Sequence, residues 1–218
     1  MSKTLIFDFD GTLHNHLPLY ARSFRKEQNA LRREGFDSRE YTDKEISRWL
    51  GMTAEEMWND FMPELPDARK AEGAKNISMR LSRGILNGES VLYEGAEQVL
   101  DSLKSKGYTL ILLSNCSQKH MDANISAFSL ERWFSLCLSS GAHPGESKAQ
   151  ILARYIGSFE NPCCVIGDRY SDFEAAKANG LKFIACRYGF GSESEFIGAD
   201  AGIDDISRLE AVLDDLKF

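Results

Sequence analysis

Short apolar runs lie beside the N-terminus and recur through the second half of the chain. The first is Leu5–Phe7, and the later ones are Leu110–Leu113, Cys163–Ile166 and Phe183–Cys186, with a minor strand expected near 199–203. Runs of this length are typical of strands that are covered on both faces, as in parallel sheets. We therefore predict a parallel β-sheet built mainly from the second half of the chain.

Segments of helical period separate the later runs. A helix that begins at Glu94 places Ala96, Val99, Leu100 and Leu103 on one face, and Gly107 ends it. Further helices are expected to begin at Ser147-x-x-Gln150 and at Ser171-x-x-Glu174, and a last one covers 205–216. This alternation predicts a Rossmann-like sheet with helices on both faces.

Residues 15–88 interrupt the alternation with a stretch of helical character in which we expect no strand. Thr42-x-x-Glu45 and Thr53-x-x-Glu56 are capping boxes, and two prolines precede a further helix over 67–83. We predict an α/β protein in which residues 1–14 and 89–218 form the Rossmann-like core and residues 15–88 form an inserted all-α domain. The hinges between them are expected near residues 14–18 and 87–91.

Two carboxylates follow the first apolar run directly, in the order Asp8-Phe9-Asp10-Gly11-Thr12. Side chains at i and i+2 of a strand share a face, so both acids should project to one side. Gly11 lets the chain turn sharply beside a ligand. Such a pair can bind a divalent cation, supply a nucleophile, or divide nucleophile and acid/base roles. The alternative is a strand end followed by a solvated acidic turn.

Other polar groups follow the later strands or begin helices. Ser114-Asn115 ends the second run, Lys148 begins a helix, and Gly167-Asp168 ends the third run with Asp172 close behind. Open α/β sheets hold their ligands at the carboxyl ends of the strands. Taken together, these groups predict a site for a metal ion and a polyanion.

The four motifs in this order resemble the haloacid dehalogenase superfamily, in particular phosphoglycolate-phosphatase-like members with a helical cap. The resemblance implies that Asp8 attacks phosphorus and becomes an aspartyl phosphate. It implies that Asp10 protonates the leaving alcohol and then deprotonates the hydrolytic water. Ser114 and Asn115 would hold the transferring oxygens, and Lys148 would supply fixed positive charge. Preorganised electrostatics of this kind is usually the largest catalytic term.

The resemblance also implies a Mg²⁺ cofactor. Its protein ligands would be the Asp8 and Asp168 carboxylates and the Asp10 backbone carbonyl, and Thr12 would contact the substrate. Asp172 would orient a metal-bound water or pair with the catalytic lysine. An equally good interpretation is that Asp172 is simply an acid in the first turn of a helix, where the helix dipole favours it.

Substrate choice is expected to come from residues 15–88, the helical cap of the resembled family. The segment 49–53 resembles the family's specificity segment, although helix capping alone explains Thr53. No arginine occupies the position where mutase-like relatives bind a second phosphate, and Arg48 or Arg80 would replace it only if aimed inward. His14 and His16 stand beside the acidic motif, and His16 departs from the residue that the relatives carry more often.

Composition is consistent with a small-molecule enzyme. The 218 residues carry a net charge of −7, with 43% hydrophobic and 27% charged residues. The acidic balance argues against a nucleic-acid partner. No apolar run is long enough to span a membrane, and we expect no signal peptide. The five cysteines lack metal-binding spacing, so we expect reduced thiols in a cytoplasmic protein, either a monomer or a homodimer.

Three functions remain open at this point. The first is a Mg²⁺-dependent phosphatase that acts on a small phosphorylated metabolite, phosphoglycolate-like in the broad sense. The second is a β-phosphoglucomutase-like phosphosugar mutase, which the missing arginine disfavours. The third is a phosphate-sensing protein without turnover, which would have no need of the general acid Asp10.

Overall fold

The computed structural model describes residues 3–36 and 39–218. Its centre is a six-stranded sheet in the order β5-β4-β1-β6-β7-β8, and every neighbouring pair of strands is parallel. The strands are β1 (Thr4–Phe7), β4 (Thr109–Ser114), β5 (Phe134–Ser139), β6 (Cys163–Gly167), β7 (Lys182–Cys186) and β8 (Ala201–Ile203). In the middle of the sheet, Phe7 lies opposite Leu112 of β4 and Ile166 of β6.

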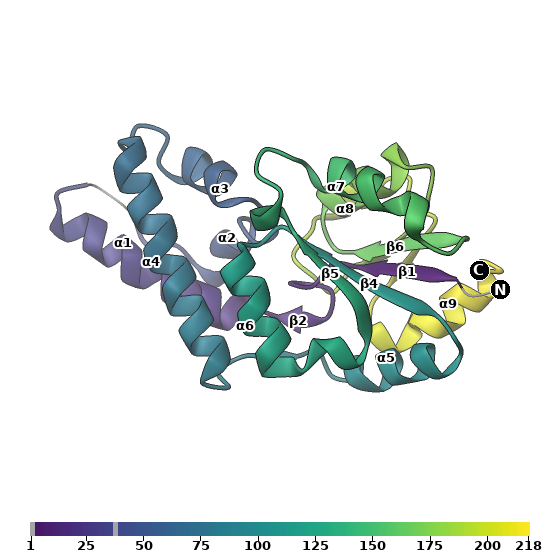
Figure 1. Cartoon of the computed structure of the whole chain (residues 1–218). Helices are drawn as coiled ribbons and strands as arrows, with labels where there is room; N and C mark the ends of the chain where they lie inside the picture. The colour runs from purple at the N-terminus through teal and green to yellow at the C-terminus, as the bar shows by residue number, and fades with distance from the viewer. Residues whose placement is uncertain (1–2, 37–38) are drawn as a thin grey trace.

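Helices cover both faces of the sheet (Figure 1). One layer holds α5 (Ala96–Ser105) and α9 (Leu209–Asp215), and the other holds α7 (Lys148–Tyr155) and α8 (Tyr170–Ala178). Alternate residues of β1 serve the two layers, because Leu5 and Phe7 belong to one buried cluster and Ile6 to the other. This doubly covered parallel sheet confirms the α/β, Rossmann-like prediction.

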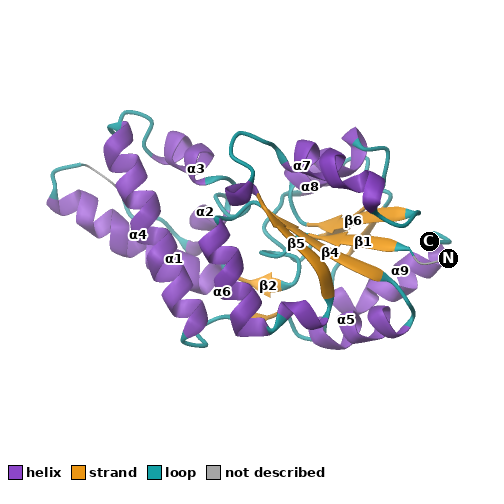
Figure 2. Cartoon of the chain, in the orientation of Figure 1, coloured by secondary structure: helices purple, strands orange, loops and turns teal. Residues whose placement is uncertain are grey.

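A third buried cluster belongs to a group of helices that lies beside the sheet (Figure 2). These helices are α1 (Leu17–Arg33), α2 (Asp43–Ser47), α3 (Ala54–Phe61) and α4 (Asp67–Leu86). Phe24, Trp49 and Phe61 pack together at its centre, with ring centroids 4.9 to 5.3 Å apart. The capping boxes that begin α2 and α3 are present as predicted.

The chain enters and leaves the helical segment through a short ribbon. Strand β2 (His14–Asn15) pairs antiparallel with β3 (Val91–Leu92), so both connections lie side by side. A remaining helix, α6 (Gln118–Phe128), follows β4 and packs against α4. Short 3-10 helices are η1 (Leu130–Arg132), η2 (Ser140–Ala142), η3 (Ile156–Ser158), η4 (Glu193–Phe196) and η5 (Ile206–Arg208).

Several element boundaries differ from the sequence-based expectation. Helix α4 continues to Leu86 rather than ending at Arg83. The predicted capping box at Ser171 is wrong, because α8 begins at Tyr170, and Asp172 accepts from the Arg169 N–H just before it. Strand β5, helix α6 and the β2–β3 ribbon were not identified individually. Residues 1–2 and 37–38 of the predicted domains lie outside the described residues.

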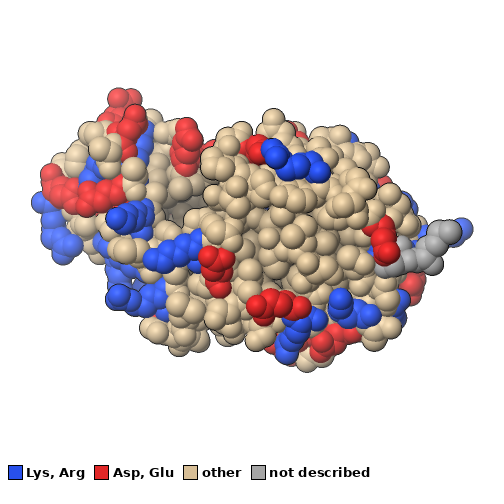
Figure 3. Space-filling view, in the orientation of Figure 1, with Lys and Arg blue, Asp and Glu red and all other residues tan. Residues whose placement is uncertain are grey.

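Charged side chains of both signs are mixed on the face drawn in Figure 3, most densely over the helical segment. Many charged side chains of the protein form ion pairs, as Arg69 does with Glu34 and Arg39 with Glu45. Within the described ranges, no helix combines the length and the apolar character that crossing a bilayer requires.

Candidate active site

The turn after β1 places the first motif at the carboxyl edge of the sheet. Asp8 continues the pairing of β1, because its N–H donates to the Ile166 carbonyl at 2.9 Å. The chain then reverses at Gly11, which has φ +93°, a region that side chains other than glycine rarely adopt. Strand β1 ends at Phe7, so the alternation of side chains between the two faces of a strand does not apply to Asp8 and Asp10. Their carboxylates belong to two adjacent groups of residues.

The first group, here called the acidic cluster, contains Asp8, Asp168, Asp172 and Lys148. Each of the three acids offers an oxygen atom, and these atoms lie within 4.8 Å of one another. Lys148 Nζ lies 2.5 Å from an oxygen of Asp8 and 2.5 Å from an oxygen of Asp172. All four side chains are buried, with exposed fractions of at most 5%. Residues from β1, α7, β6 and α8 therefore meet as the sequence predicted.

Glycines make room for these carboxylates. A Cβ atom at Gly11 would lie 2.1 Å from an Asp168 oxygen, and one at Gly189 would lie 2.3 Å from the Asp168 Cβ. At Gly167 the added atom would overlap the Asp172 carboxyl at 2.4 Å. Backbone contacts orient the acids as well, since the Phe190 N–H donates to Asp168 at 2.7 Å. The surroundings are therefore shaped around the acids.

The electrostatics of the acidic cluster favour an added cation. Burial raises the pKa of Asp8 to about 7, with Lys148 opposing the rise and Asp172 adding to it. Burial and the Asp8 carboxylate raise the pKa of Asp168 well above its ordinary value. When all three carboxylates are ionised, they and the one ammonium leave two negative charges in a buried space, a state that these raised pKa values oppose unless a cation is added. Oxygen donors with this charge fit a hard divalent cation.

Asp172 satisfies both interpretations offered for it. Its carboxylate accepts from Lys148, and its other oxygen accepts from the Arg169 N–H at 3.0 Å, at the start of α8. The residue therefore caps a helix and holds the lysine at the same time. Burial lowers the pKa of Lys148, but Asp172 and Asp8 outweigh it and raise the pKa above its ordinary value.

The second group surrounds Asp10 with imidazoles. His14 Nδ1 lies 2.6 Å from Asp10 Oδ1, and the other nitrogen of His14 pairs with Ser90. His120 Nε2 lies 3.5 Å from Asp10 Oδ2, and His16 Nδ1 lies 3.8 Å from Oδ1. Burial would raise the pKa of Asp10, but the three histidines outweigh it and hold this pKa well below its ordinary value.

His120 was missed by the sequence reasoning. It lies in the first turn of α6, where Ser117 caps the helix by accepting from the His120 N–H. Nothing local in the sequence marks this histidine, because its partner Asp10 belongs to a distant strand end. His14 and His16 were noted, and both now lie beside the acid/base candidate.

The remaining predicted residues lie around the same edge. Ser114 is buried at the end of β4, and the Asn115 side chain donates to the Gly51 carbonyl at 3.1 Å. Asn115 thereby joins the sheet edge to the loop before α3. The Thr12 hydroxyl is fully buried and donates to Asp168 at 3.3 Å, so it contacts the acidic cluster.

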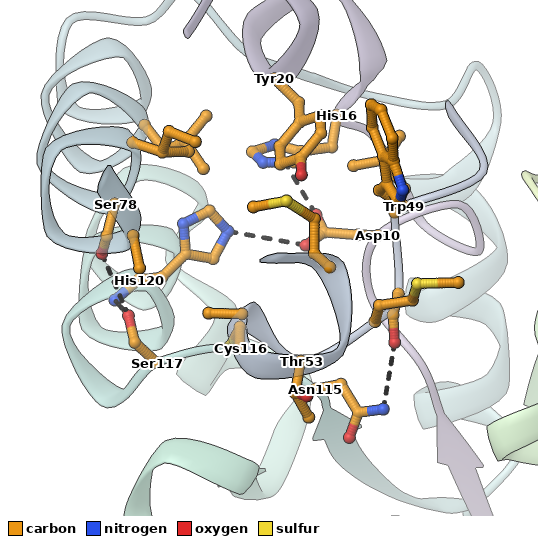
Figure 4. A pocket seen from close by; sticks show the side chains of 18 residues that line it. Asp10, His16, Tyr20, Trp49, Thr53, Ser78, Asn115, Cys116, Ser117 and His120 are labelled. Atoms are coloured by element: carbon orange, nitrogen blue, oxygen red, sulfur yellow. Dashed lines mark hydrogen bonds and ion pairs between the residues drawn. The ribbon is translucent and has the colours of Figure 1, made fainter. Parts of the chain in front are cut away.

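A pocket opens from Asp10 toward the helical segment (Figure 4). Its volume is about 140 Å³, and its walls come from α1, α3, α4 and the residues that follow β4. Trp49 and Tyr20 line one side, and Ser78, Ser117 and His120 line the other. Asp10 therefore stands between the acidic cluster and a partly open pocket large enough for a small molecule.

Comparison with known proteins identifies the class. The model of the haloacid dehalogenase-like hydrolase family matches residues 5–186. The chain therefore belongs to this family, and the family and enzyme class expected from the sequence, a phosphatase, are confirmed.

Individual relatives agree with that class. The chain is 26% identical to a phosphoglycolate phosphatase of Pasteurella multocida, over 97% of this chain and 98% of that protein. It is 27% identical to a 5'-nucleotidase of Pseudomonas aeruginosa, over 88% of this chain and 85% of that protein. The crystal structure of a predicted phosphatase from Clostridium acetobutylicum has the same fold, with a TM-score of 0.84 at 21% identity over 98% and 99% of the two chains.

Proposed function

We propose that this protein is a Mg²⁺-dependent phosphatase that hydrolyses a small phosphorylated metabolite through an aspartyl phosphate on Asp8. The observation that carries the proposal is the acidic cluster, in which Lys148 touches both Asp8 and Asp172 while Asp168 lies within 4.8 Å. A phosphate ester repels anionic attackers, so a carboxylate nucleophile needs positive charge around it.

The metal site follows from the same residues. We propose that the Asp8 and Asp168 carboxylates and the Asp10 backbone carbonyl hold Mg²⁺, with Asp172 fixing Lys148 beside them. When bound, Mg²⁺ supplies positive charge that offsets the buried carboxylates and the phosphoryl oxygens. The two excess negative charges of the acidic cluster support a divalent rather than a monovalent ion.

In the first step, an Asp8 oxygen attacks phosphorus, the bond from phosphorus to the ester oxygen breaks, and the departing oxygen takes a proton from Asp10. In the second step, Asp10 takes a proton from water, the water oxygen attacks phosphorus, and the bond to Asp8 breaks to release inorganic phosphate. Ser114, the Asn115 N–H and Lys148 hold the phosphoryl oxygens in both steps. Thr12 supports them by holding Asp168.

The three histidines support the acid/base assignment of Asp10. Hydrogen bonding to His14, which is itself held by Ser90, fixes the orientation of the Asp10 carboxylate. A dianionic ester bound beside this carboxylate would raise its pKa and so favour the protonated form needed in the first step. A protein that only binds phosphate needs no such group.

The helical segment has the role of a cap in this proposal. Residues 1–14 and 89–218 would form the catalytic core, and residues 15–88 would close over Asp10. The β2–β3 ribbon, where both connections run together, supports hinges near residues 14–18 and 87–91. Closure excludes water before attack and opening admits it afterwards.

Phosphatase activity has more support than mutase activity. Arg48 pairs with Asp60 and Arg80 pairs with Glu27 at 2.7 Å, and neither arginine lines the pocket. A second phosphate of a sugar bisphosphate would therefore meet no arginine there. The names of the relatives support phosphoglycolate and nucleoside monophosphates as first substrates to test.

The test is steady-state release of inorganic phosphate from a panel of monoesters, with and without Mg²⁺. Asp8→Asn should lower the rate by about 10⁴-fold or more, because the nucleophile is lost. Asp122→Asn, which changes an exposed carboxylate on α6, is the matched control and should keep full activity. Equal rates for Asp8→Asn and the unchanged protein would contradict the proposal.

A further inference from the structure

Apolar side chains make up about half of the walls of the pocket beside Asp10 and most of the part formed by the helical segment. They come from three helices and from the loop before α3 (Figure 4). The apolar lining residues are Tyr20, Trp49, Leu50, Met52, Ala54, Met57, Ala74, Ile77 and Leu81. Apolar walls of this extent select for apolar ligand surface, because each buried methylene contributes favourable transfer free energy.

Polar groups of the pocket are mostly engaged with other protein groups. The Asn115 amide donates to the Gly51 carbonyl, and the Ser78 and Ser117 hydroxyls contact each other at 3.3 Å. Thr53 is engaged in the capping box with Glu56. The polar groups left for a ligand lie at the Asp10 end, where His16 Nδ1 and both nitrogens of His120 are buried without a hydrogen bond within the described residues.

No lysine or arginine belongs to the described lining. The arginines nearby are bound elsewhere, since Arg48 pairs with Asp60 and Arg80 with Glu27. Arg169 lies against Gly51, but its guanidinium pairs with Glu195 and reaches the Arg48 carbonyl. These three arginines are therefore already neutralised.

The histidines do not replace the missing cation. His16 and His120 both face the Asp10 carboxylate, at 3.8 and 3.5 Å, so a proton on either ring would be balanced by that carboxylate. A carboxylate or second phosphate on the ester would enter a pocket whose described lining holds the Asp10 carboxylate and no lysine or arginine. Burying a charge without a partner is strongly unfavourable.

We propose that the substrate is a compact phosphate monoester whose alcohol part is uncharged and mainly apolar. This inference rests on the proposed function and names the substrate class of the same site. The pocket volume of about 140 Å³ limits the alcohol part to a small group. Phosphoglycolate has a suitable size but carries a carboxylate that the pocket does not pair.

A pair of esters with the same heavy-atom skeleton isolates the charge. In phosphoglycolate the CH2–O–phosphate unit carries a carboxylate. In isobutyl phosphate the same unit carries an isopropyl group, whose two methyl groups take the places of the two carboxylate oxygens. At saturating Mg²⁺ and neutral pH, kcat/KM should be about 100-fold or more higher for isobutyl phosphate, because the carboxylate loses its hydration without gaining a partner. Extending ethyl phosphate to propyl phosphate should raise kcat/KM about tenfold, the lower end of the range for one methylene in a fitted pocket.

A positive charge placed in the wall of the pocket should reverse the preference for the uncharged ester. Met52 lines the pocket from the loop before α3 and is half-buried, so a lysine there can reach the pocket without disturbing a helix. Met52→Lys should raise kcat/KM for phosphoglycolate and lower it for isobutyl phosphate. Met52→Gln is the matched neutral control and should not improve phosphoglycolate hydrolysis.

Binding provides a readout that does not depend on turnover. Isopentylphosphonate and 3-phosphonopropionate are uncleavable analogues of the same two shapes, and calorimetry with the Mg²⁺-loaded protein should find the uncharged one tighter. Equal or tighter binding of the carboxylate analogue would overturn the substrate class. Hydrolysis of phosphoglycolate at least as fast as isobutyl phosphate would also overturn it and leave the phosphatase proposal standing. Absence of hydrolysis of every ester, with the phosphonate preference intact, would count against the phosphatase proposal and support the pocket assignment.

Discussion

Asp8 and Asp10 lie two residues apart, yet the first faces a lysine and two other carboxylates whereas the second faces three histidines. Burial raises the pKa of Asp8 to about 7. The histidines hold the pKa of Asp10 well below its ordinary value against the same effect of burial. The pKa values of two carboxylates in one turn are therefore shifted in opposite directions, by burial at Asp8 and by the histidines at Asp10, which supports the different roles proposed for them.

The same contrast holds for the surroundings of the two residues. The acidic cluster is dense in charge and is assembled from strand ends and helix starts. The pocket on the Asp10 side is richer in apolar side chains and is formed mainly by the helical segment, with further residues that follow β4. Under the proposed function, phosphoryl chemistry and choice of the alcohol part would be physically separate, so substitutions on one side should leave the properties of the other side intact.

Apart from loss of the proposed nucleophile, the largest effect should come from removing the ammonium group of the acidic cluster. Lys148→Met leaves three buried carboxylates together, so kcat/KM should fall about 10³-fold and the free energy of unfolding by about 3 kcal/mol in Mg²⁺-free buffer. Chemical denaturation and phosphate release measure the two losses. Lys119→Met, which removes an exposed lysine of α6, is the control. Lys148→Met should leave the order of preference among esters of different size unchanged. A changed order would show that the acidic cluster and the pocket do not act independently.

The next largest effect should follow from changing the acid/base group. Asp10→Asn should lower kcat for isobutyl phosphate about 10³-fold, because an alkoxide leaves poorly without a proton. 4-Nitrophenol leaves without protonation, so the first burst of nitrophenol from 4-nitrophenyl phosphate should slow about tenfold or less. Stopped-flow absorbance separates that burst from the later hydrolysis. Equal slowing of both esters would show that Asp10 does not protonate the leaving group.

Sequence patterns were sufficient for the centre of the fold and for the acidic cluster. The runs around Leu5, Leu110, Cys163 and Phe183 are fully apolar because both faces of those strands are covered, so local composition identifies them. Edge strand β5 (Phe134–Ser139) was not predicted, because exposed and half-buried residues interrupt its apolar run. Short motifs were also enough to predict the residues of the acidic cluster, because each of these residues follows a strand or lies at the start of a helix.

The pocket could not be predicted in the same way. His120 reaches Asp10 only through the packing of α6 against α4, and Asn115 reaches Gly51 only because the helical segment lies over the sheet edge. Such contacts depend on the relative placement of distant elements, which no local pattern encodes. The orientation of Arg48 and Arg80 away from the pocket was open for the same reason. The domain boundaries themselves stay a prediction.

A smaller effect should appear in metal binding as pH changes. A protonated Asp8 cannot bind Mg²⁺, and its pKa is about 7, so the metal must displace a proton below that pH. The affinity for Mg²⁺ should therefore fall about tenfold between pH 8 and pH 6, and further if Asp168, whose pKa is also raised, takes up a proton. Titration calorimetry in buffers of different ionisation enthalpy would detect the released proton. A Mg²⁺ affinity that does not change over this range would remove Asp8 from the ligand set.

The smallest effect should come from Thr53, which both begins α3 and lines the pocket. If capping is its role, Thr53→Ala should lower the free energy of unfolding by about 1 kcal/mol. Thr42→Ala removes the equivalent capping box of α2, which lies outside the pocket lining, and should cost the same amount. A substrate contact would instead raise KM in Thr53→Ala alone. Because the two threonines have the same cap geometry, both variants lose the same helix cap. Any difference in KM between them would therefore come from a lost substrate contact in the pocket.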